Sequence, residues 1–284
     1  MSLLDFILNL AGLLLWISWR NQPHDPAVTA RPATLPGTLR RAEPVRARRW
    51  QFLAALGALL VVRAVAYYWV GGALGQVQII HLGVLALPFR CDLFWSRMLP
   101  GSFLSFADMW LTYFAWLLLF SLVPSAGGDP GPGQRLVRLQ LGRVARWPRW
   151  LRVALPFLVA ALAWLGLAPA LAWLGVIPGA AGLGVRAQQA VVMGLGGYLL
   201  WQPAVVCVLV LHLLDTHVYL GAHPLWGFVG GVGRWLLRPL RWLPLRFGRM
   251  DFAPVAGLAL VFPLGRLLED QTWGLPALYR RLPL

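Results

Sequence analysis

Three charged side chains fall where the sequence is otherwise apolar, and they are the residues best placed to do chemistry. Asp5, Arg63 and Asp108 each lie inside or at the edge of a long hydrophobic run. Ionisable groups within membrane spans often mark an ion or proton path. The alternative is structural, with Arg63 paired in a helix bundle and the aspartates at the interface. We favour the structural interpretation and predict that Arg63 lies near Asp5 or Asp108.

Three histidines at the end of another apolar run suggest a second kind of site. His212, His217 and His223 surround Asp215, and paired histidines can ligate haem or a metal ion. Positions 212 and 217 do not share a helical face, because helix neighbours are three or four residues apart. We therefore expect interfacial histidines, no metal and no cofactor.

No complete catalytic signature is present, and we expect no enzymatic activity. The sequence contains no nucleophile elbow, phosphate-binding loop or zinc-protease helix. Cys91 and Cys207 give neither a disulfide framework nor metal-ligand spacing. The small residues Gly194, Gly196 and Gly197 lie within an apolar run, where close helix packing explains them better than a nucleotide loop.

Composition indicates a membrane protein. Hydrophobic residues make up 59% of the chain and charged residues 12%, against about 25% charged in soluble domains. All 25 basic residues are arginine, and the net charge is +15. These arginines flank apolar runs, so the expected anionic partner is the phospholipid head group and not nucleic acid.

The apolar runs predict an all-α fold with about six transmembrane helices, because a helix needs about 20 residues to cross the bilayer core. The predicted spans are 3–19, 51–70, 103–123, 151–177, 191–214 and 252–268. Residues 77–87 are too few to cross and are expected to be re-entrant or interfacial. The first span lacks the basic start of a secretory signal.

The arginines fix the predicted orientation. Segments 20–50, 124–152 and 216–251 hold 18 of them, whereas the other gaps, the end of the last span and the tail hold six. Positively charged connections stay in the cytoplasm. The alternation predicts a multi-pass protein of the cell (inner) membrane with both termini outside the cytoplasm.

Two Arg/Trp-rich connections have the periodicity of amphipathic helices that lie at the membrane surface, within 135–151 and 226–243. In the first, Leu136, Val137 and Leu139 are expected on the apolar side. An ordinary basic loop is the alternative. The arginines expected to bind lipid or a partner protein are Arg135, Arg138, Arg146, Arg149, Arg234, Arg238 and Arg241.

The order of these segments suggests two parallel hairpin repeats, 103–177 and 190–268. In each, an apolar span leads to a turn with proline, then to an Arg/Trp-rich segment and a second span. Residues 1–102 would form a separate two-helix region with the cytoplasmic loop 20–50, and 269–284 a short tail.

A proline, arginine, glycine and aspartate pattern at 223–263 resembles a known family. The matching residues are Pro224, Pro239, Arg241, Pro244, Gly248, Asp251 and Pro254. This pattern is similar to the signature of the YggT family of small integral membrane proteins. His223 and Ala253 stand where the family usually has Asp and Ser, and Pro244 comes one residue early.

The same residues make physical sense without the family. Asp251 precedes a membrane helix, where a carboxylate caps free amides. Pro254 suits the first turn of that helix. Gly248 would permit a sharp turn, and Arg241 would pair with Asp251 or hold a lipid phosphate. We expect structural roles for these residues.

Three functions are compatible with the sequence. The first is a non-catalytic organiser of the membrane or envelope that acts through lipids or an unidentified membrane or cytoplasmic protein. The resemblance implies such roles, in osmotic-stress tolerance, cell division or, in plastid relatives, cytochrome maturation. The second is a small channel or transporter, and the third is a haem-handling assembly factor. A homo-oligomer is compatible with each of them.

Overall fold

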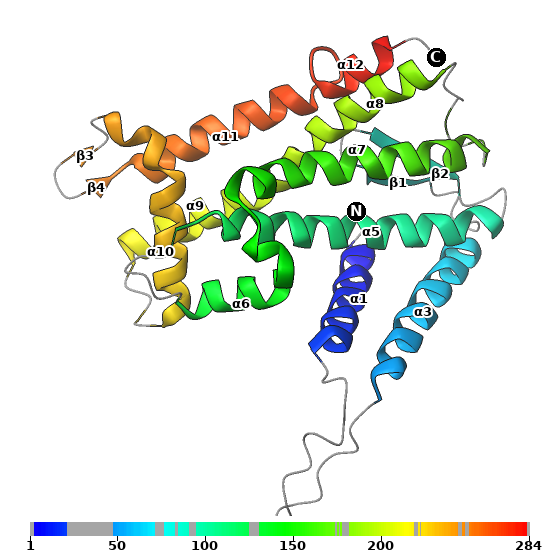
Figure 1. Cartoon of the computed structure of the whole chain (residues 1–284), viewed down its shortest axis with the longest axis horizontal. Helices are drawn as coiled ribbons and strands as arrows, with labels where there is room; N and C mark the ends of the chain where they lie inside the picture. The colour runs from blue at the N-terminus through cyan, green and yellow to red at the C-terminus, as the bar shows by residue number, and fades with distance from the viewer. Residues whose placement is uncertain are drawn as a thin grey trace, which may run out of the picture. The chain divides into compact units, whose positions relative to one another are not determined.

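Helices form the framework of the chain, as predicted (Figure 1). The computed structural model describes residues 3–21, 48–71, 77–82, 85–90, 95–124, 131–173, 175, 177, 182–218, 221, 223–243, 246–247 and 250–282. Five helical stretches are long and apolar enough to cross a membrane: Leu3–Asn21, Arg49–Trp69, Met98–Ser121, Arg149–Trp173 and Leu183–His217. Only 17–33% of each stretch is buried within the protein, so most of their apolar surface is left for lipid.

The sixth predicted span is also helical. It corresponds to α11, Ala253–Glu269, which has 17 residues. That length is at the lower limit for crossing the hydrocarbon core. Six crossings therefore stay a prediction.

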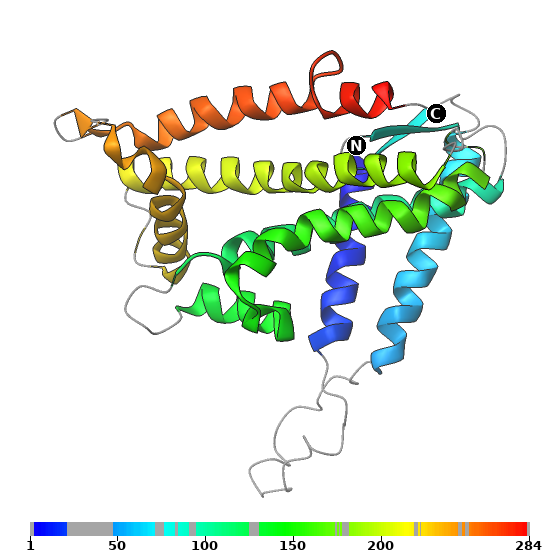
Figure 2. The same ribbon diagram turned by 45° about the horizontal axis from the view of Figure 1, so that its top comes forward.

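The chain forms two compact units, which we describe separately. The first comprises residues 1–80 and 87–110. In it, α1 (Leu3–Asn21) packs against α3 (Arg49–Ala66), and the two run in opposite directions (Figure 2). A π-helical turn, η2 (Tyr67–Gly71), extends α3. The beginning of α5 (Trp95–Ser121) also belongs to this unit, and Phe106 on it lies against Gly12 of α1.

The second unit comprises residues 81–86 and 111–284. Its long helices are α7 (Arg149–Trp173), α8 (Leu183–Gly196), α9 (Gln202–His217) and α11. α7 packs against α8, and α9 packs against α11. The tail contains α12 (Leu275–Arg281), which packs on α8 and α11. Leu275 is buried, and the ring of Tyr279 meets that of Trp164 on α7 edge-on.

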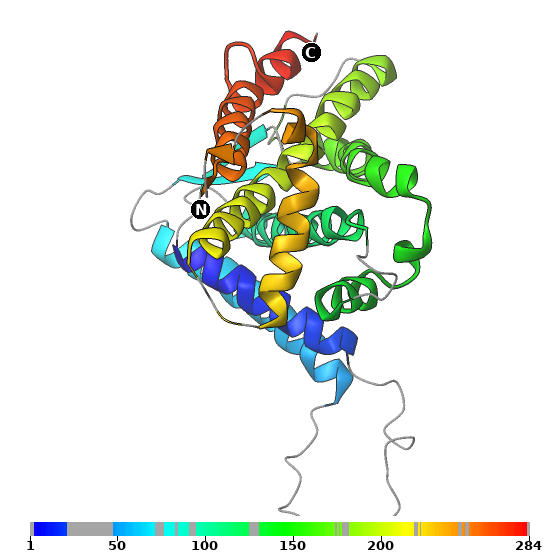
Figure 3. The same ribbon diagram turned by 90° about the vertical axis from the view of Figure 1, so that its left-hand side faces the viewer.

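Two shorter helices lie together at one end of this unit. α6 (Pro132–Leu141) contacts α10 (Pro224–Leu236), and Figure 3 views the unit from this end. Phe228 of α10 packs on Gly133 of α6 and meets the ring of Phe120 edge-on. The segments 131–141 and 224–236, far apart in sequence, are therefore neighbours.

The order of elements is the same in the two halves of this unit. α5 is followed by α6, the 3₁₀ turn η3 (Gly142–Arg146) and α7. α9 is followed by α10, the 3₁₀ turn η5 (Arg238–Trp242) and α11. This order agrees with the repeat proposed from the sequence, although the repeat itself stays a prediction. The second half has one addition, the antiparallel pair β3 (Arg246–Phe247) and β4 (Met250–Asp251).

The stretch predicted to be re-entrant or interfacial contains strands. β1 (Val77–Leu82) and β2 (Leu85–Arg90) form a two-stranded sheet. Val77, Ile79 and Ile80 are β-branched residues, which favour strands. The shortness of the stretch predicted a re-entrant or interfacial piece, whereas its β-branched residues favour the strands observed.

α8, η4 (Gly197–Trp201) and α9 form one helical rod, Leu183–His217, of 35 residues. At 1.5 Å per residue it is about 50 Å long, well beyond the hydrocarbon core of about 30 Å. The predicted span, 191–214, lies within this rod, and the helix itself begins earlier, at Leu183. Pro203 has no amide hydrogen for the carbonyl of Leu199, and that carbonyl instead accepts from Gln202 in the 3₁₀ turn.

Glycines allow α7 to approach the rod formed by α8 and η4 closely, in agreement with the close helix packing predicted for Gly194, Gly196 and Gly197. A Cβ atom at Gly197 would lie 2.7 Å from the carbonyl oxygen of Pro156, and one at Gly194 would lie 2.7 Å from the ring of Phe157. Small residues are the usual device for helix contact in lipid, where no hydrophobic force draws helices together.

We predict that Gly197→Ala lowers the free energy of unfolding by about 1–3 kcal/mol, because the backbone of α7 must move to admit the methyl group. Gly184→Ala is the matched control on the same helix, since its Cβ would meet nothing within 4 Å. Thermal unfolding in detergent compares the two. Equal melting temperatures would contradict the packing described here.

Candidate functional site

A buried polar cluster centred on Arg63 joins three helices of the first unit. Its guanidinium is 3.3 Å from Asp5 (Nη2 to Oδ1) and donates from Nη2 to Ser105 Oγ at 2.7 Å. Nη1 donates to Asn9 Oδ1, and Nε donates to the Tyr67 hydroxyl at 2.6 Å. Arg63 is 2% exposed and Asn9 is fully buried.

The cluster is internally satisfied. Each of the three guanidinium nitrogens has a partner, and Asn9 also donates to Ser105 at 3.1 Å. A transported ion or proton would require an open coordination position or a hydrogen-bonded path. The geometry instead matches the structural interpretation, in which Arg63 holds α1, α3 and α5 together.

The structure joins Asp5 to Arg63 but does not bring Asp108 into the cluster. Asp108 makes no hydrogen bond or ion pair with any residue that the structure describes. Asn9, Tyr67 and Ser105 were missed. Asn9 follows Asp5 by four residues on the same helical face, and this spacing was a signal available in the sequence.

The histidines do not share a site. His212 is buried and packs against Gly233 of α10, whereas the Nδ1 atom of His217 lies 2.9 Å from the carbonyl oxygen of Leu213. His223 precedes α10, and its Nδ1 accepts from the amide of Leu225 at 3.3 Å. Each has a different local role. Within the described ranges, no three His, Cys, Asp or Glu residues gather as metal ligands would.

The family-motif residues lie at helix starts. Asp251 accepts from the amide of Ala253 at 3.0 Å, as expected of a cap before α11, and Pro254 is buried in the first turn. Pro224 occupies the first turn of α10, and Pro239 that of η5, which also contains Arg241. His223 supplies a cap acceptor where the family usually has Asp. Pro244 and Gly248 lie outside the described residues.

The surface of α6 is divided differently from the prediction. Val137 and Leu141 are buried, but Leu136 and Leu139 are 58% and 78% exposed. At 100° per residue, the exposed side has a leucine flank and an arginine flank, the latter formed by Arg135 and Arg138. Val137 was expected on one apolar side with Leu136 and Leu139; it instead packs in the interior of the unit, and the two leucines are exposed.

Exposed apolar and cationic groups continue around this end of the second unit. Trp150 and Trp242 are 71% and 80% exposed, while Arg146 and Arg149 on one side and Arg234 and Arg238 on the other are also exposed. Exposed leucine and tryptophan beside arginine are typical of the head-group region, which offers both hydrocarbon and anions. We call the exposed residues of α6, η3, the first turn of α7, α10 and η5 the arginine surface.

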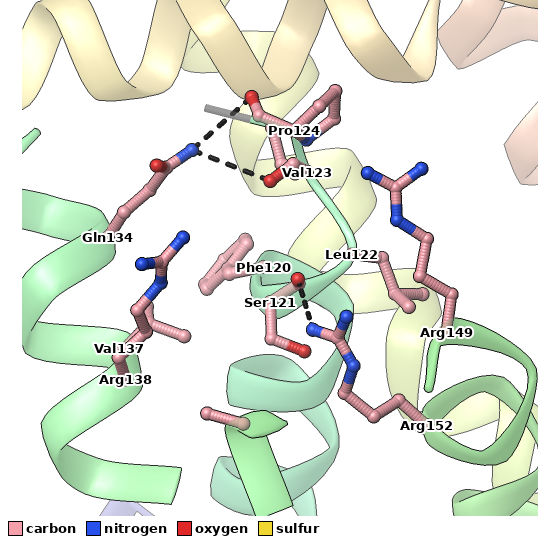
Figure 4. A pocket seen from close by; sticks show the side chains of 11 residues that line it. Phe120, Ser121, Leu122, Val123, Pro124, Gln134, Val137, Arg138, Arg149 and Arg152 are labelled. Carbon is pink, nitrogen blue, oxygen red and sulfur yellow. Dashed lines mark hydrogen bonds between the residues drawn. The ribbon is translucent and has the colours of Figure 1, made fainter. Parts of the chain in front are cut away.

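Within the arginine surface, a pocket of about 140 Å³ lies between the end of α5, α6 and the beginning of α7 (Figure 4). Arg138, Arg149 and Arg152 line it, with Gln134 and Ser121. Arg152 donates from Nη1 to the carbonyl oxygen of Ser121 at 2.5 Å, which caps the end of α5.

Comparison of the chain with models of protein families, with curated proteins and with solved structures gives no match. The resemblance to the YggT family therefore depends on the residues at 223–263 and stays a prediction.

We predict that Asp5→Asn destabilises the first unit by about 3–5 kcal/mol, because it leaves the Arg63 charge buried without a counter-charge. Asp108→Asn makes the same substitution outside the cluster and is expected to have a much smaller effect. Unfolding in detergent, followed by circular dichroism, measures both. A larger effect of Asp108→Asn would show that the wrong carboxylate has been assigned to Arg63.

Proposed function

We propose that the protein is a non-catalytic, multi-pass protein of the inner membrane that binds anionic lipid head groups through its arginine surface. Of the three functions compatible with the sequence, this is the one for which the described geometry gives most support. The proposal extends to a YggT-type role in organising the membrane or envelope, with osmotic-stress tolerance and cell division as the settings that the resemblance implies.

The observation that carries the proposal is the composition of the exposed side of α6. Leu136 and Leu139 would be unfavourable in water, and Arg135 and Arg138 would be unfavourable in hydrocarbon. At the boundary between water and hydrocarbon, the two leucines can contact hydrocarbon while the two arginines contact water and head groups. α10 lies beside α6 with Arg234 exposed on it, so the two halves of the unit contribute to one surface.

The proposed topology follows from the same surface. With the arginine surface in the cytoplasmic head groups, six crossings would place both termini outside. The two halves would then be parallel repeats, each with an outer start and a cytoplasmic surface helix. The closed cluster at Arg63 and the separate roles of the histidines give less support to a channel or a haem-handling factor.

We predict that the purified protein retains phosphatidylglycerol in preference to phosphatidylcholine. Replacing Arg135, Arg234 and Arg238 by Gln should weaken this preference about tenfold or more, since each cation near an anionic surface contributes about 1 kcal/mol. Native mass spectrometry after exposure to equal amounts of the two lipids measures the ratio.

The matched control replaces Arg186, Arg266 and Arg281 by Gln. It removes the same charge from segments that the topology places at the outer side. If the control loses as much phosphatidylglycerol as the arginine-surface variant, net charge and not this surface governs binding. An unchanged ratio in both variants would reject the proposed function.

A further inference from the structure

The pocket in the arginine surface has the shape of a site and not of a flat charged patch. It is enclosed by three helical segments, and Figure 4 shows the Arg138, Arg149 and Arg152 side chains around it. Arg138 comes from α6, whereas Arg149 and Arg152 come from the first turn of α7. Its volume of about 140 Å³ greatly exceeds what one water molecule needs, so a larger group can enter.

The charges around the pocket are all of one sign. Among the described residues that line it, three are arginine and none is Asp or Glu. Neighbouring guanidinium groups repel one another, and the partial burial of Arg152 removes hydration that would offset the repulsion. An anion that enters from outside relieves both costs.

The end of α5 is capped by Arg152 and Gln134. Arg152 caps α5 through Nη1, and Gln134 donates weakly to the carbonyl oxygens of Val123 and Pro124, at 3.4 Å each. The end of α5 is therefore satisfied without Arg138 or Arg149. The Nε atom of Arg152 is buried with no acceptor among the described residues. Nε and the adjacent Nη2 form the edge of a guanidinium that takes two oxygens of an oxyanion.

We propose that this pocket binds a single phosphate group, held by Arg138, Arg149 and Arg152. The inference rests on the proposed function and makes it more specific, since one phosphate would be held in a defined place instead of by diffuse attraction. The exposed leucine flank of α6 and Trp150 put the pocket beside hydrocarbon, which a phospholipid would also contact. A free phosphate ion has the same chemistry, and the experiment separates the two sources.

The test compares two double variants of equal charge in the full chain. Arg138→Gln with Arg149→Gln removes two pocket arginines and leaves the Arg152 cap intact. Arg266→Gln with Arg281→Gln is the control, because both residues are exposed, neither lines the pocket and neither belongs to the arginine surface. Native mass spectrometry counts phosphatidylglycerol molecules that survive delipidation, with and without inorganic phosphate in excess.

We expect the wild type and the control to retain one phosphatidylglycerol per chain, and the pocket variant to retain at least tenfold less. Competition by inorganic phosphate alone, with no lipid retained, would support the phosphate site and identify a soluble source. Retention of the lipid by the pocket variant would overturn the site while leaving the proposed function intact, and equal losses in the two double variants would show that net charge governs retention and would overturn the site as well. Absence of any lipid preference in the wild type, with no phosphate bound, would overturn both.

If the pocket variant is less stable than the control, titration of the wild type decides instead. A saturable loss of the last retained lipid with added phosphate, but not with the same concentration of chloride, supports the site. Displacement by both salts equally would contradict it, because a pocket for phosphate must discriminate beyond ionic strength.

Discussion

A guanidinium group cannot remain unpaired in hydrocarbon, and this constraint accounts for the placement of the described arginines. An arginine in the middle of a span must either find a counter-charge or reach the interface. Arg63 has a counter-charge, Asp5, in a cluster that Asn9, Tyr67 and Ser105 complete. Most of the other described arginines lie near helix ends or in the short helices between spans, where they can reach the interface. The fold keeps apolar rods in one medium and cations in another.

Helix association in the second unit depends more on close packing at small residues than on the amount of apolar surface that is buried. The apolar stretches are at most one-third buried, so lipid can cover most of their surface. Close approach is achieved where side chains are absent, as at Gly197 against Pro156 and at Gly233 against His212. In a bilayer, van der Waals contact and a few internal hydrogen bonds must supply the association energy. One such bond runs from the Trp116 indole to the carbonyl oxygen of Leu200, at 2.9 Å.

Much of this could be predicted from the sequence, because hydropathy and arginine position are strong local signals. The helical class, the approximate ends of the spans and a carboxylate near Arg63 followed from them, although the sequence did not decide between Asp5 and Asp108. Helix ends in polar sequence were less predictable: the stretch around Gln188 and Gln189 looks like a connection, yet α8 begins at Leu183. The two-stranded sheet at 77–90 was missed because β-branched residues in a short apolar run suit either structure.

The pocket could not be predicted from the sequence at all. Arg138 and Arg149 were selected as surface cations, but Arg152 was assigned only to a basic connection. Their convergence depends on how η3 turns the chain between α6 and α7, and on where α5 ends at Ser121. Periodicity within one helix contains no information about which residues of different helices come together. The same limit applies to the division of α6 into a leucine flank and an arginine flank, which requires knowing the face that the protein covers.

The central claim is that the arginine-rich connections lie together on the cytoplasmic side of the membrane. Single cysteines introduced by Arg40→Cys, Arg143→Cys and Arg241→Cys, in a chain without Cys91 and Cys207, test it most directly. With Gln271→Cys as the outer control, an impermeant thiol reagent added to intact cells should label only position 271. After permeabilisation it should label all four. Labelling of one arginine position but not the others in intact cells would contradict the account.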